Sequence, residues 1–409
     1  WSGMGLYLIS GTIVCLVEPP YAERHVRWCE RLGPSGPHLL DYYIQVYPDF
    51  GGMMKVLVGM SGGIDSSVAA YLLKQQGHEV MGVTMTIWNK RSHLSRPLNS
   101  TSCFAPDKTE DIRAIKKICE KIGIEHQVLE LSDLFEEIVL SNFKAEYMDG
   151  RTPNPCVWCN AKIKFGAMVE YAMQSGLVFD RFATGHYARI VEQNGRYAVA
   201  KAVDLKKDQS YFLYRLNQEQ LARTLFPLGG MTKEDVRKID VAQGFHKVYQ
   251  EESQDFYDGD YTDLLDISAR QGNIVTKQGE VLGRHEGIWH YTIGQRKGLG
   301  IAAPRPLYVL ELRADTNEVV VGFVEDTLQS TVTASDVVWS KVSSLEGEVV
   351  VQAKIRSTGY ATEAKARQND DGTITAIFSD EVKAATVGQS LVLYDGSTIL
   401  CGGIIVQAC

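Results

Sequence analysis

One stretch near residue 60 constrains the fold of this chain more than any other. The apolar run Val56-Leu57-Val58 is followed by Gly59-Met60-Ser61-Gly62-Gly63-Ile64-Asp65-Ser66 and then by a helical pattern of apolar residues. A short run that is apolar on both faces predicts a buried parallel strand. Glycine takes positive φ freely, and the start of a helix presents free N–H groups at the positive end of its dipole. The stretch therefore predicts a strand–turn–helix unit that binds an anion.

This turn differs from the phosphate loop of kinase-type proteins, because it lacks their Gly-Lys-Ser/Thr ending. Its Ser-Gly-Gly-x-Asp-Ser pattern at residues 61–66 resembles the PP-loop of the ATP pyrophosphatases, which cleave ATP between the α- and β-phosphates. The resemblance implies an ATP site. It also implies that Asp65 positions Mg²⁺ on the departing pyrophosphate, since Mg²⁺ prefers oxygen ligands.

Strands and helices alternate from Met54 to about residue 257, which predicts an open parallel sheet covered by helices. Expected strands are 55–58, 79–84, 125–129 and 181–183, and expected helices are 66–76, 108–122, 133–148 and 161–174. Ligands of such sheets bind at the carboxyl ends of the strands. We therefore expect residues 59–67, Met85, Cys103 and Gly185 to line one crevice.

From Gly272 onward, short alternating runs separated by glycine turns predict small β-barrels. The expected architecture is an α/β PP-loop domain of the adenine nucleotide alpha-hydrolase-like kind at residues 54–257. A small central β domain at 258–327 and a C-terminal β-barrel at 328–409 follow it. Residues 1–53 continue neither pattern, and we expect them to be a non-native or disordered extension.

Composition narrows the class of protein. The net charge of −8 argues against a general polyanion binder, so a nucleic-acid partner requires a local basic face. Eight cysteines in 409 residues do not indicate a disulfide scaffold, and reduced thiols predict a cytoplasmic protein. No run of apolar residues is long enough to predict a membrane span.

Two cysteines lie three positions apart in Cys156-Val157-Trp158-Cys159, directly before an expected helix. Such a pair can form a disulfide, ligate a metal, or have one thiolate stabilised by the helix N-terminus. Pro153 and Pro155 stiffen the approach to it. No second Cys/His pair with zinc spacing follows, so a structural zinc site is not expected.

From Met54 to its end, the chain resembles the tRNA-specific 2-thiouridylase family. The matching segments, in chain order, are residues 59–66, 150–155 with Cys159-Asn160, 183–187, 207–213, 252–255, 291–300 and 388–390. Together they span about 350 residues, and only the first 53 residues fall outside.

The resemblance implies an ATP-dependent enzyme that adenylates O2 of the wobble uridine of tRNA. Sulfur from a cysteine persulfide, supplied by a sulfur-donor protein, then displaces AMP. Implied ATP-binding residues are Gly59, Met60, Ser61, Gly62, Gly63, Ile64, Asp65 and Ser66, with Met85 and Gly185 beside the adenosine. Implied tRNA-contacting residues are Asn154, Pro155, Cys156, His186, Lys207, Asp208, Gln209, Arg356, Ser357 and Gln389.

The chain departs from the family pattern at two places. Cys156 stands where the best-known members have an aspartate, and residues 252–261 lack the second catalytic cysteine. One solution is that Cys156 and Cys159 act as the catalytic pair. Another is a 4Fe–4S cluster held by Cys103, Cys156 and Cys159. A third is a lost or altered activity.

Two other functions stay open on the sequence. One is a different PP-loop enzyme, either an amidotransferase-type ligase or a lysidine-forming tRNA enzyme, whose chemistry needs no paired thiols. The other is a non-catalytic adaptor that binds a nucleotide or an iron–sulfur cluster. The ATP and Mg²⁺ expectations follow from the PP-loop resemblance in either enzyme.

Overall fold

The computed structural model describes residues 5–9, 12–16, 52–88, 109–246, 257, 264–265 and 269–409. The chain forms two compact units, Trp1–Gly51 and Gly52–Cys409. In the first unit, β1 (Gly5–Ile9) pairs antiparallel with β2 (Thr12–Leu16). The expectation that residues 1–53 are a non-native or disordered extension stays a prediction.

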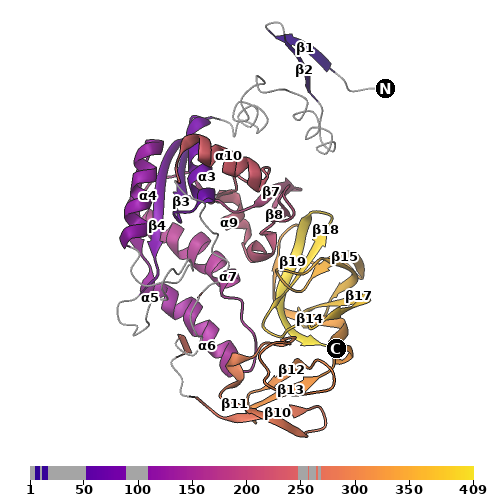
Figure 1. Ribbon diagram of the computed structural model, residues 1–409. Helices are drawn as coiled ribbons and strands as arrows, with labels where there is room; N and C mark the ends of the chain where they lie inside the picture. Colours follow the sequence, from indigo (N-terminus) through magenta and orange to yellow (C-terminus); the bar gives the residue numbers. More distant parts are fainter. Residues whose placement is uncertain are drawn as a thin grey trace. The chain divides into compact units, whose positions relative to one another are not determined.

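A five-stranded parallel sheet organises the first part of the second unit (Figure 1). Its order is β5 (Glu125–Glu130), β4 (Glu79–Thr86), β3 (Lys55–Gly59), β6 (Arg181–Ala183) and β9 (Thr224–Leu225). β3 lies in the middle, and its three apolar residues are at most 1% exposed. Burial on both faces is what the continuous apolar run of β3 predicts.

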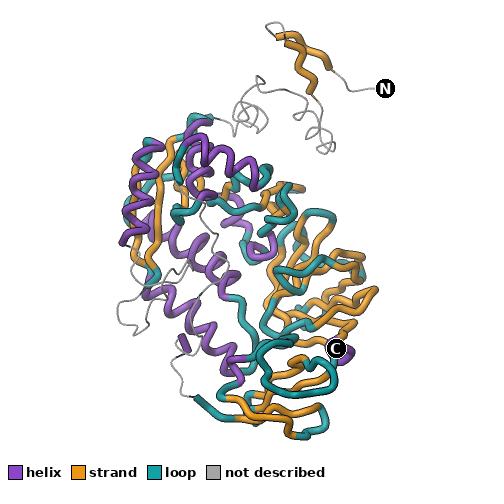
Figure 2. Tube along the Cα trace, viewed as in Figure 1, coloured by secondary structure: helices purple, strands orange, loops and turns teal. Residues whose placement is uncertain are grey.

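Helices cover both faces of this sheet (Figure 2). On one face, α3 (Ile64–Gln75) and α4 (Thr109–Ile122) share a core with Val56 and Val58. On the other, Leu57 joins the core of the helices between residues 132 and 174. The alternation of β3 side chains between two cores shows why the sheet needs both helix layers.

Two of the expected helices contain wider, π-helical turns. The helix expected at 133–148 consists of α5 (Ser132–Phe135), η1 (Glu136–Leu140) and α6 (Ser141–Met148). The helix expected at 161–174 starts earlier and consists of α7 (Pro155–Trp158), η2 (Cys159–Ala167) and α8 (Met168–Gln174). Apolar periodicity located both helices but does not register the local change in pitch.

The rest of the α/β part is built from shorter elements. A hairpin of β7 (Ala188–Gln193) and β8 (Arg196–Lys201) is followed by the 3₁₀ turn η3 (Ser210–Leu213), α9 (Gln218–Arg223) and α10 (Lys233–Gln243). The N-cap of α10 is Thr232, whose side chain accepts from the Asp235 N–H, and Gly244 ends the helix in the left-handed conformation.

A four-stranded central sheet follows, in the order β11 (Val281–His285), β10 (Gly272–Thr276), β13 (Glu318–Gly322) and β12 (Tyr308–Arg313). The C-terminal strands are β14 (Leu328–Trp339), β17 (Ile374–Lys383), β16 (Thr362–Gln368), β15 (Val349–Lys354), β18 (Ser390–Asp395) and β19 (Thr398–Ala408). Pairing of β14 with β19 closes these six into a barrel.

The predicted fold class is therefore confirmed: a parallel α/β sheet, a small central β domain and an antiparallel barrel follow in that order. Among the helices of the described residues, none has both the length and the apolar character needed to cross a bilayer.

Candidate nucleotide and thiol site

The carboxyl ends of β3, β4 and β6, where the sequence predicts a ligand crevice, lie along one edge of the parallel sheet. The loop after β3 is tied to β4 by a hydrogen bond of 2.7 Å from the Met60 N–H to the Val83 carbonyl. Gly185, just after β6, lies directly against the start of α3, since a Cβ there would be 2.7 Å from the Ser66 nitrogen. Residues 59–67, Met85 and Gly185 thus share one edge, whereas Cys103 lies outside the described residues.

Hydroxyl groups hold the loop in shape. Ser66 Oγ accepts from the Ser61 N–H at 3.2 Å and donates to the Gly63 carbonyl at 3.1 Å. Gly62 has φ +86°, which glycine adopts without strain. Within the described part of the chain, no acceptor bonds the N–H groups of Ile64, Asp65 and Ser66. These three donors at the start of α3 form a cradle suited to phosphate.

Asp65 is engaged by two side chains that come from much later in the chain. Lys233 Nζ lies 2.7 and 2.8 Å from its two carboxylate oxygens, and Tyr187 donates its hydroxyl to Oδ1 at 2.9 Å. The Lys233 side chain is only 7% exposed, and the Asp65 carboxylate is its ion-pair partner.

This arrangement limits how Mg²⁺ fits the loop. The described residues contain no group of three His, Cys, Asp or Glu side chains able to hold a metal ion. One carboxylate beside a phosphate cradle is nevertheless a donor set that Mg²⁺ accepts, because this ion usually keeps waters and phosphate oxygens as its other ligands. Asp65 supplies this carboxylate, and its binding of Mg²⁺ stays a prediction.

The two cysteines lie at the start of the long α7–η2–α8 helix. Asn154 is the N-cap and accepts from the Val157 N–H at 3.4 Å, and Pro155 takes the first helical position. Cys156 is half-buried and Cys159 is buried at the start of η2. No disulfide joins the two. Six residues further along η2, Phe165 packs on Phe182 at 5.4 Å between ring centroids, which brings this helix to the nucleotide end of the sheet.

The barrel holds the segment that leads into the cysteine turn. The Thr152 N–H donates to the Val387 carbonyl at 3.0 Å, and Gln389 Nε2 donates to the carbonyls of Thr152 and Pro153 at 3.0 and 3.1 Å. Gly388, with φ +91°, approaches so closely that a Cβ would lie 2.8 Å from the Thr152 carbonyl oxygen. The barrel therefore fixes the backbone two residues ahead of Asn154.

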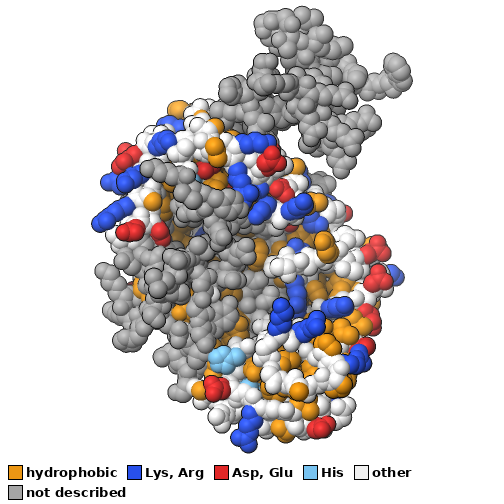
Figure 3. Space-filling model, viewed as in Figure 1, with side chains coloured by type: hydrophobic (Ala, Val, Ile, Leu, Met, Phe, Trp, Pro, Cys, Tyr) orange, Lys and Arg blue, Asp and Glu red, His pale blue; other side chains and the backbone are white. Residues whose placement is uncertain are grey.

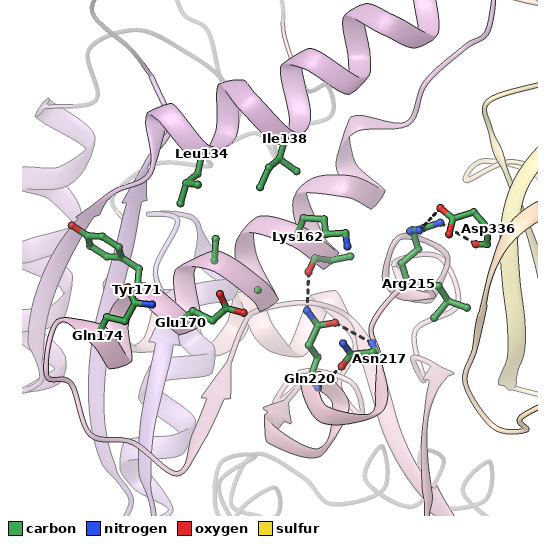
Figure 4. Close-up of a pocket in the computed structure, with 14 residues that line it drawn as sticks. Leu134, Ile138, Lys162, Glu170, Tyr171, Gln174, Arg215, Asn217, Gln220 and Asp336 are labelled. Atoms are coloured by element: carbon green, nitrogen blue, oxygen red, sulfur yellow. Dashed lines mark hydrogen bonds and ion pairs between the residues drawn. The ribbon is translucent and has the colours of Figure 1, made fainter.

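A pocket of about 580 Å³ lies along the η2–α8 helix, with walls from η1, α9 and β14 (Figure 4). The Arg215 guanidinium in its wall stacks over the Trp158 ring, 4.7 Å from the centroid, and bonds Asp336 Oδ2 at 2.6 Å. Asp336 has φ +50° and occupies a bulge of β14. Through Arg215, this strand of the barrel is linked to Trp158, which directly precedes Cys159.

Known protein families match almost the whole of the second unit. Residues 54–257 match the family described as tRNA methyl transferase HUP domain, 265–323 its PRC-barrel domain, and 329–405 the Aminomethyltransferase beta-barrel domain. The tRNA-specific 2-thiouridylase MnmA of Endomicrobium trichonymphae is 45% identical over 357 residues, which cover 86% of this chain and 99% of that protein. The chain belongs to the tRNA-specific 2-thiouridylase family.

Further curated relatives support this assignment. The tRNA-specific 2-thiouridylase MnmA of Clostridium botulinum (strain Alaska E43) is 42% identical over 358 residues, covering 86% of this chain and 97% of the relative. MnmA 2 of Clostridium tetani is 44% identical over 359 residues, covering 86% and 98%. The resemblance seen in the sequence is confirmed.

In this 2-thiouridylase family member, several residues expected at the tRNA have internal partners. Gln209 Oε1 accepts from the Tyr187 N–H at 2.9 Å, and Asp208 accepts from the Ala202 N–H and the Ser210 hydroxyl. Arg356 donates to the carbonyls of Ile293 and Ala384 and to Thr386 Oγ1. Together with Gln389, these side chains form hydrogen bonds within the protein. Their contact with tRNA stays a prediction.

His186 bonds Thr184 Oγ1 at 2.6 Å and packs among Phe165 and Phe226. Burial, with a smaller contribution from Lys164, places the pKa of His186 well below its usual range. The ring is therefore neutral at pH 7. Lys207 and Ser357 are half-buried. Lys354, at the end of β15 in the barrel, has its pKa lowered by burial.

Sequence reasoning missed Lys233, Tyr187 as a partner of Asp65, and His246. Lys233 reaches Asp65 across 168 residues of chain, and His246 reaches the Gly62 carbonyl across 184. No local pattern links such residues to the phosphate loop. The one available signal was the Thr232 N-cap, which marks Lys233 as the first residue of a helix.

Proposed function

We propose that this protein catalyses the ATP-dependent 2-thiolation of the wobble uridine of tRNA in the cytoplasm. The observation that carries the proposal is a PP-loop and a Cys-x-x-Cys turn in one domain of a 2-thiouridylase family member. The helix that starts at the cysteines also packs beside the nucleotide edge, through Phe165 against His186 at 5.8 Å. Both halves of the reaction are thus served by one rigid unit.

The first half-reaction consumes ATP. The uridine O2 attacks the α-phosphate, the bond to the β-phosphate breaks, and pyrophosphate leaves. The N–H groups of Ile64, Asp65 and Ser66 stabilise the phosphate charge, and Asp65 is the residue that would hold Mg²⁺ there. Lys233 beside Asp65 supplies a fixed positive charge at this point. The step turns a carbonyl oxygen, a poor leaving group, into AMP, a good one.

The second half-reaction transfers sulfur. In the two-cysteine route, a sulfur-donor protein loads one thiol of Cys156 or Cys159 as a persulfide. Its terminal sulfur attacks uridine C2 and AMP leaves with the oxygen. The other thiol then attacks the loaded cysteine, which releases 2-thiouridine and forms a Cys156–Cys159 disulfide. An external thiol reductant must restore the pair for the next turnover.

The alternative route uses a 4Fe–4S cluster held by Cys103, Cys156 and Cys159. Cys156 and Cys159, one helical turn apart, fit two of its ligand positions, and Cys103 lies outside the described residues. When bound, such a cluster supplies an open iron that carries the sulfur. In this route the two thiolates act as ligands and are not themselves oxidised.

Three measurements test the proposal. Cys156→Ser and Cys159→Ser should abolish 2-thiouridine, detected by mass spectrometry of digested tRNA, and leave ATP binding intact. A ligase or lysidine-forming activity would tolerate both changes, and an adaptor would bind ATP yet release no pyrophosphate with tRNA. Iron and sulfide analysis of anaerobically purified protein and of Cys103→Ala separates the two sulfur routes, since a cluster gives about four irons per chain.

Binding of tRNA requires a basic face despite the net charge of −8. Lys and Arg side chains form a row from the region of β7, β8 and α10 down across the front of the barrel (Figure 3). Arg296 and Lys297 are exposed in a glycine-flanked turn of the central domain. Phosphate contacts of this kind position the RNA, and recognition of an unstacked base provides specificity.

A further inference from the structure

A buried pair of side chains lies directly beneath the phosphate loop. His246, two residues beyond the Gly244 that ends α10, places Nε2 3.0 Å from the Gly62 carbonyl oxygen and Nδ1 2.6 Å from Asp240 Oδ1. The His246 and Asp240 side chains are 10% and 4% exposed. Neither residue belongs to the ATP-binding set expected from the sequence.

The Gly62 contact fixes one of the hydrogens on the His246 ring. A carbonyl oxygen only accepts hydrogen bonds, so Nε2 carries a hydrogen toward Gly62. The 2.6 Å contact between Nδ1 and the carboxylate also requires a hydrogen, whichever of the two groups holds it. Asp240 therefore locks the imidazole in one orientation, with a permanent donor facing the phosphate loop.

Such a donor matters because of what the loop must do. A phosphate cradle needs its N–H groups directed at the anion and its carbonyl oxygens directed away. The peptide between Gly62 and Gly63 joins two glycines, one of them at φ +86°, so side chains do little to stop it from rotating. A rotated peptide would present a carbonyl oxygen to the phosphates and repel them.

We propose that His246, oriented by Asp240, is a positioning residue that holds the Gly62–Gly63 peptide in its anion-binding orientation. The inference rests on the proposed function, since it assumes that ATP binds at this loop. His246 contacts the loop through the Gly62 carbonyl, a backbone atom, so it acts through the loop and not on the nucleotide.

Helix α10 explains why the position of His246 is fixed. Its first residue, Lys233, bonds Asp65, while the segment after its last turn bonds Gly62. Between these contacts Phe245 packs edge-to-face on Tyr71 of α3 at 5.6 Å, and Lys121 of α4 donates to the Gly244 carbonyl at 2.8 Å. The helix therefore contacts the phosphate loop from both of its ends.

The test compares nucleotide binding in four variants and a control. Dissociation constants are measured by calorimetry for α,β-methylene-ATP with Mg²⁺, and KM and kcat are measured for tRNA-dependent pyrophosphate release. His246→Ala should raise the nucleotide Kd and the KM for ATP about tenfold or more, with little change in tRNA affinity. His246→Gln should recover most of this loss, because its amide can still donate to Gly62.

Asp240 provides the second arm. Asp240→Asn should stay near wild type, because the amide N–H donates to Nδ1 and leaves the Nε2 hydrogen for Gly62. Asp240→Ala should resemble His246→Ala. The matched control is His285→Gln, a buried histidine of β11 that bonds the Gly287 N–H and should change stability without changing the Kd for nucleotide.

The outcomes separate cleanly. If folded His246→Ala and Asp240→Ala bind the analogue as wild type does, the inference is wrong. If His246→Ala does not fold, the order Asp240→Asn above Asp240→Ala in affinity still decides, and equal affinities overturn it. If the wild-type protein itself fails to bind the analogue, the proposed function fails before this inference is reached.

Discussion

At the scale of single residues, the Asp65 carboxylate lies beside the cradle in which phosphate charge must accumulate. Lys233 offsets that negative charge through bonds of 2.7 and 2.8 Å to both oxygens. Removing the ammonium leaves a carboxylate paired only with the Tyr187 hydroxyl, next to a polyanion. We expect Lys233→Met to reduce tRNA-dependent pyrophosphate release about 10- to 100-fold.

Lys233→Arg is the control for this prediction, because it keeps the charge in a different shape. It should retain more activity than Lys233→Met in the same pyrophosphate assay. Wild-type rates for Lys233→Met would show that the ion pair serves folding alone.

Histidine protonation makes the stability of the protein depend on pH. Burial lowers the pKa of His186, His126 and His285, with neighbouring charges contributing less. An unfolded histidine has a pKa of about 6.5. Below this pH the unfolded chain therefore binds more protons than the folded chain, in which these histidines stay neutral. The free energy of unfolding should therefore fall as the pH drops from 7 through 6.5.

Urea unfolding at pH 7.0, 6.0 and 5.5 checks this direction. Replacing His186 by Phe should make the decline shallower by up to one proton per molecule, the contribution of one group. A variant whose stability falls as steeply as that of wild type would show that His186 is protonated alike in both states.

Residues whose role depends on contacts with nearby positions in the sequence could be predicted. Gly62 and Ser66 form the loop because the spacing of glycines and hydroxyls lies within one turn, and Gly185 was placed by the rule for strand ends. Lys233 and His246 were not, because helix α10 meets the loop only after the sheet has formed. Gln389 was singled out for RNA, yet its amide nitrogen bonds the backbone of Thr152 and Pro153, a contact that requires the barrel to be in place.

At the scale of elements, the wide turns of η2 need a partner outside the helix. Gln220, from the first turn of α9 (Figure 4), donates its amide to the carbonyls of Ala161 at 2.8 Å and Phe165 at 3.1 Å. One side chain thus spans the stretch that follows Cys159. The periodicity of apolar residues predicts a helix here, but it does not indicate that Gln220 of α9 stabilises the wide turns.

Gln220→Leu should remove both bonds at similar volume and leave two carbonyls with one partner fewer. It also removes the capping bond that Gln220 Oε1 accepts from the Asn217 N–H. We expect a loss of about 1–3 kcal/mol in the free energy of unfolding, measured by urea denaturation. Thiolation should fall more than ATP binding, because η2 begins at Cys159 and the phosphate loop lies on another element. Equal losses in the two assays would mean that the wide turns do not position the cysteine.

At the scale of the whole second unit, the barrel and the α/β domain share an interface, which we call the seam. The sequence pattern predicts the two domains but not this interface. Tyr211 donates its hydroxyl to the Ser390 carbonyl at 3.0 Å, and Ser390 Oγ bonds the Tyr214 hydroxyl at 3.2 Å. β8 also pairs with β19 through Ala200 and Thr398. Strand and turn signals define each domain from local residues, whereas the seam depends on partners about 180 residues apart, so it could not be predicted.

This seam predicts that the barrel stabilises the cysteine turn through Gly388. Alanine at Gly388 would adopt a left-handed backbone, φ +91°, and its Cβ would lie 2.8 Å from the Thr152 carbonyl oxygen. Gly372, in an exposed turn at φ +82°, has no atom within 4 Å of such a Cβ. Gly372→Ala should therefore cost only backbone strain, about 1 kcal/mol, and Gly388→Ala at least about 1–3 kcal/mol more.

Thermal unfolding measures both costs. Thiolation should fall in Gly388→Ala and not in Gly372→Ala, because only Gly388 contacts the backbone leading to Asn154 and Cys156. Equal activities in two folded variants would show that the barrel contributes stability but does not position the thiols.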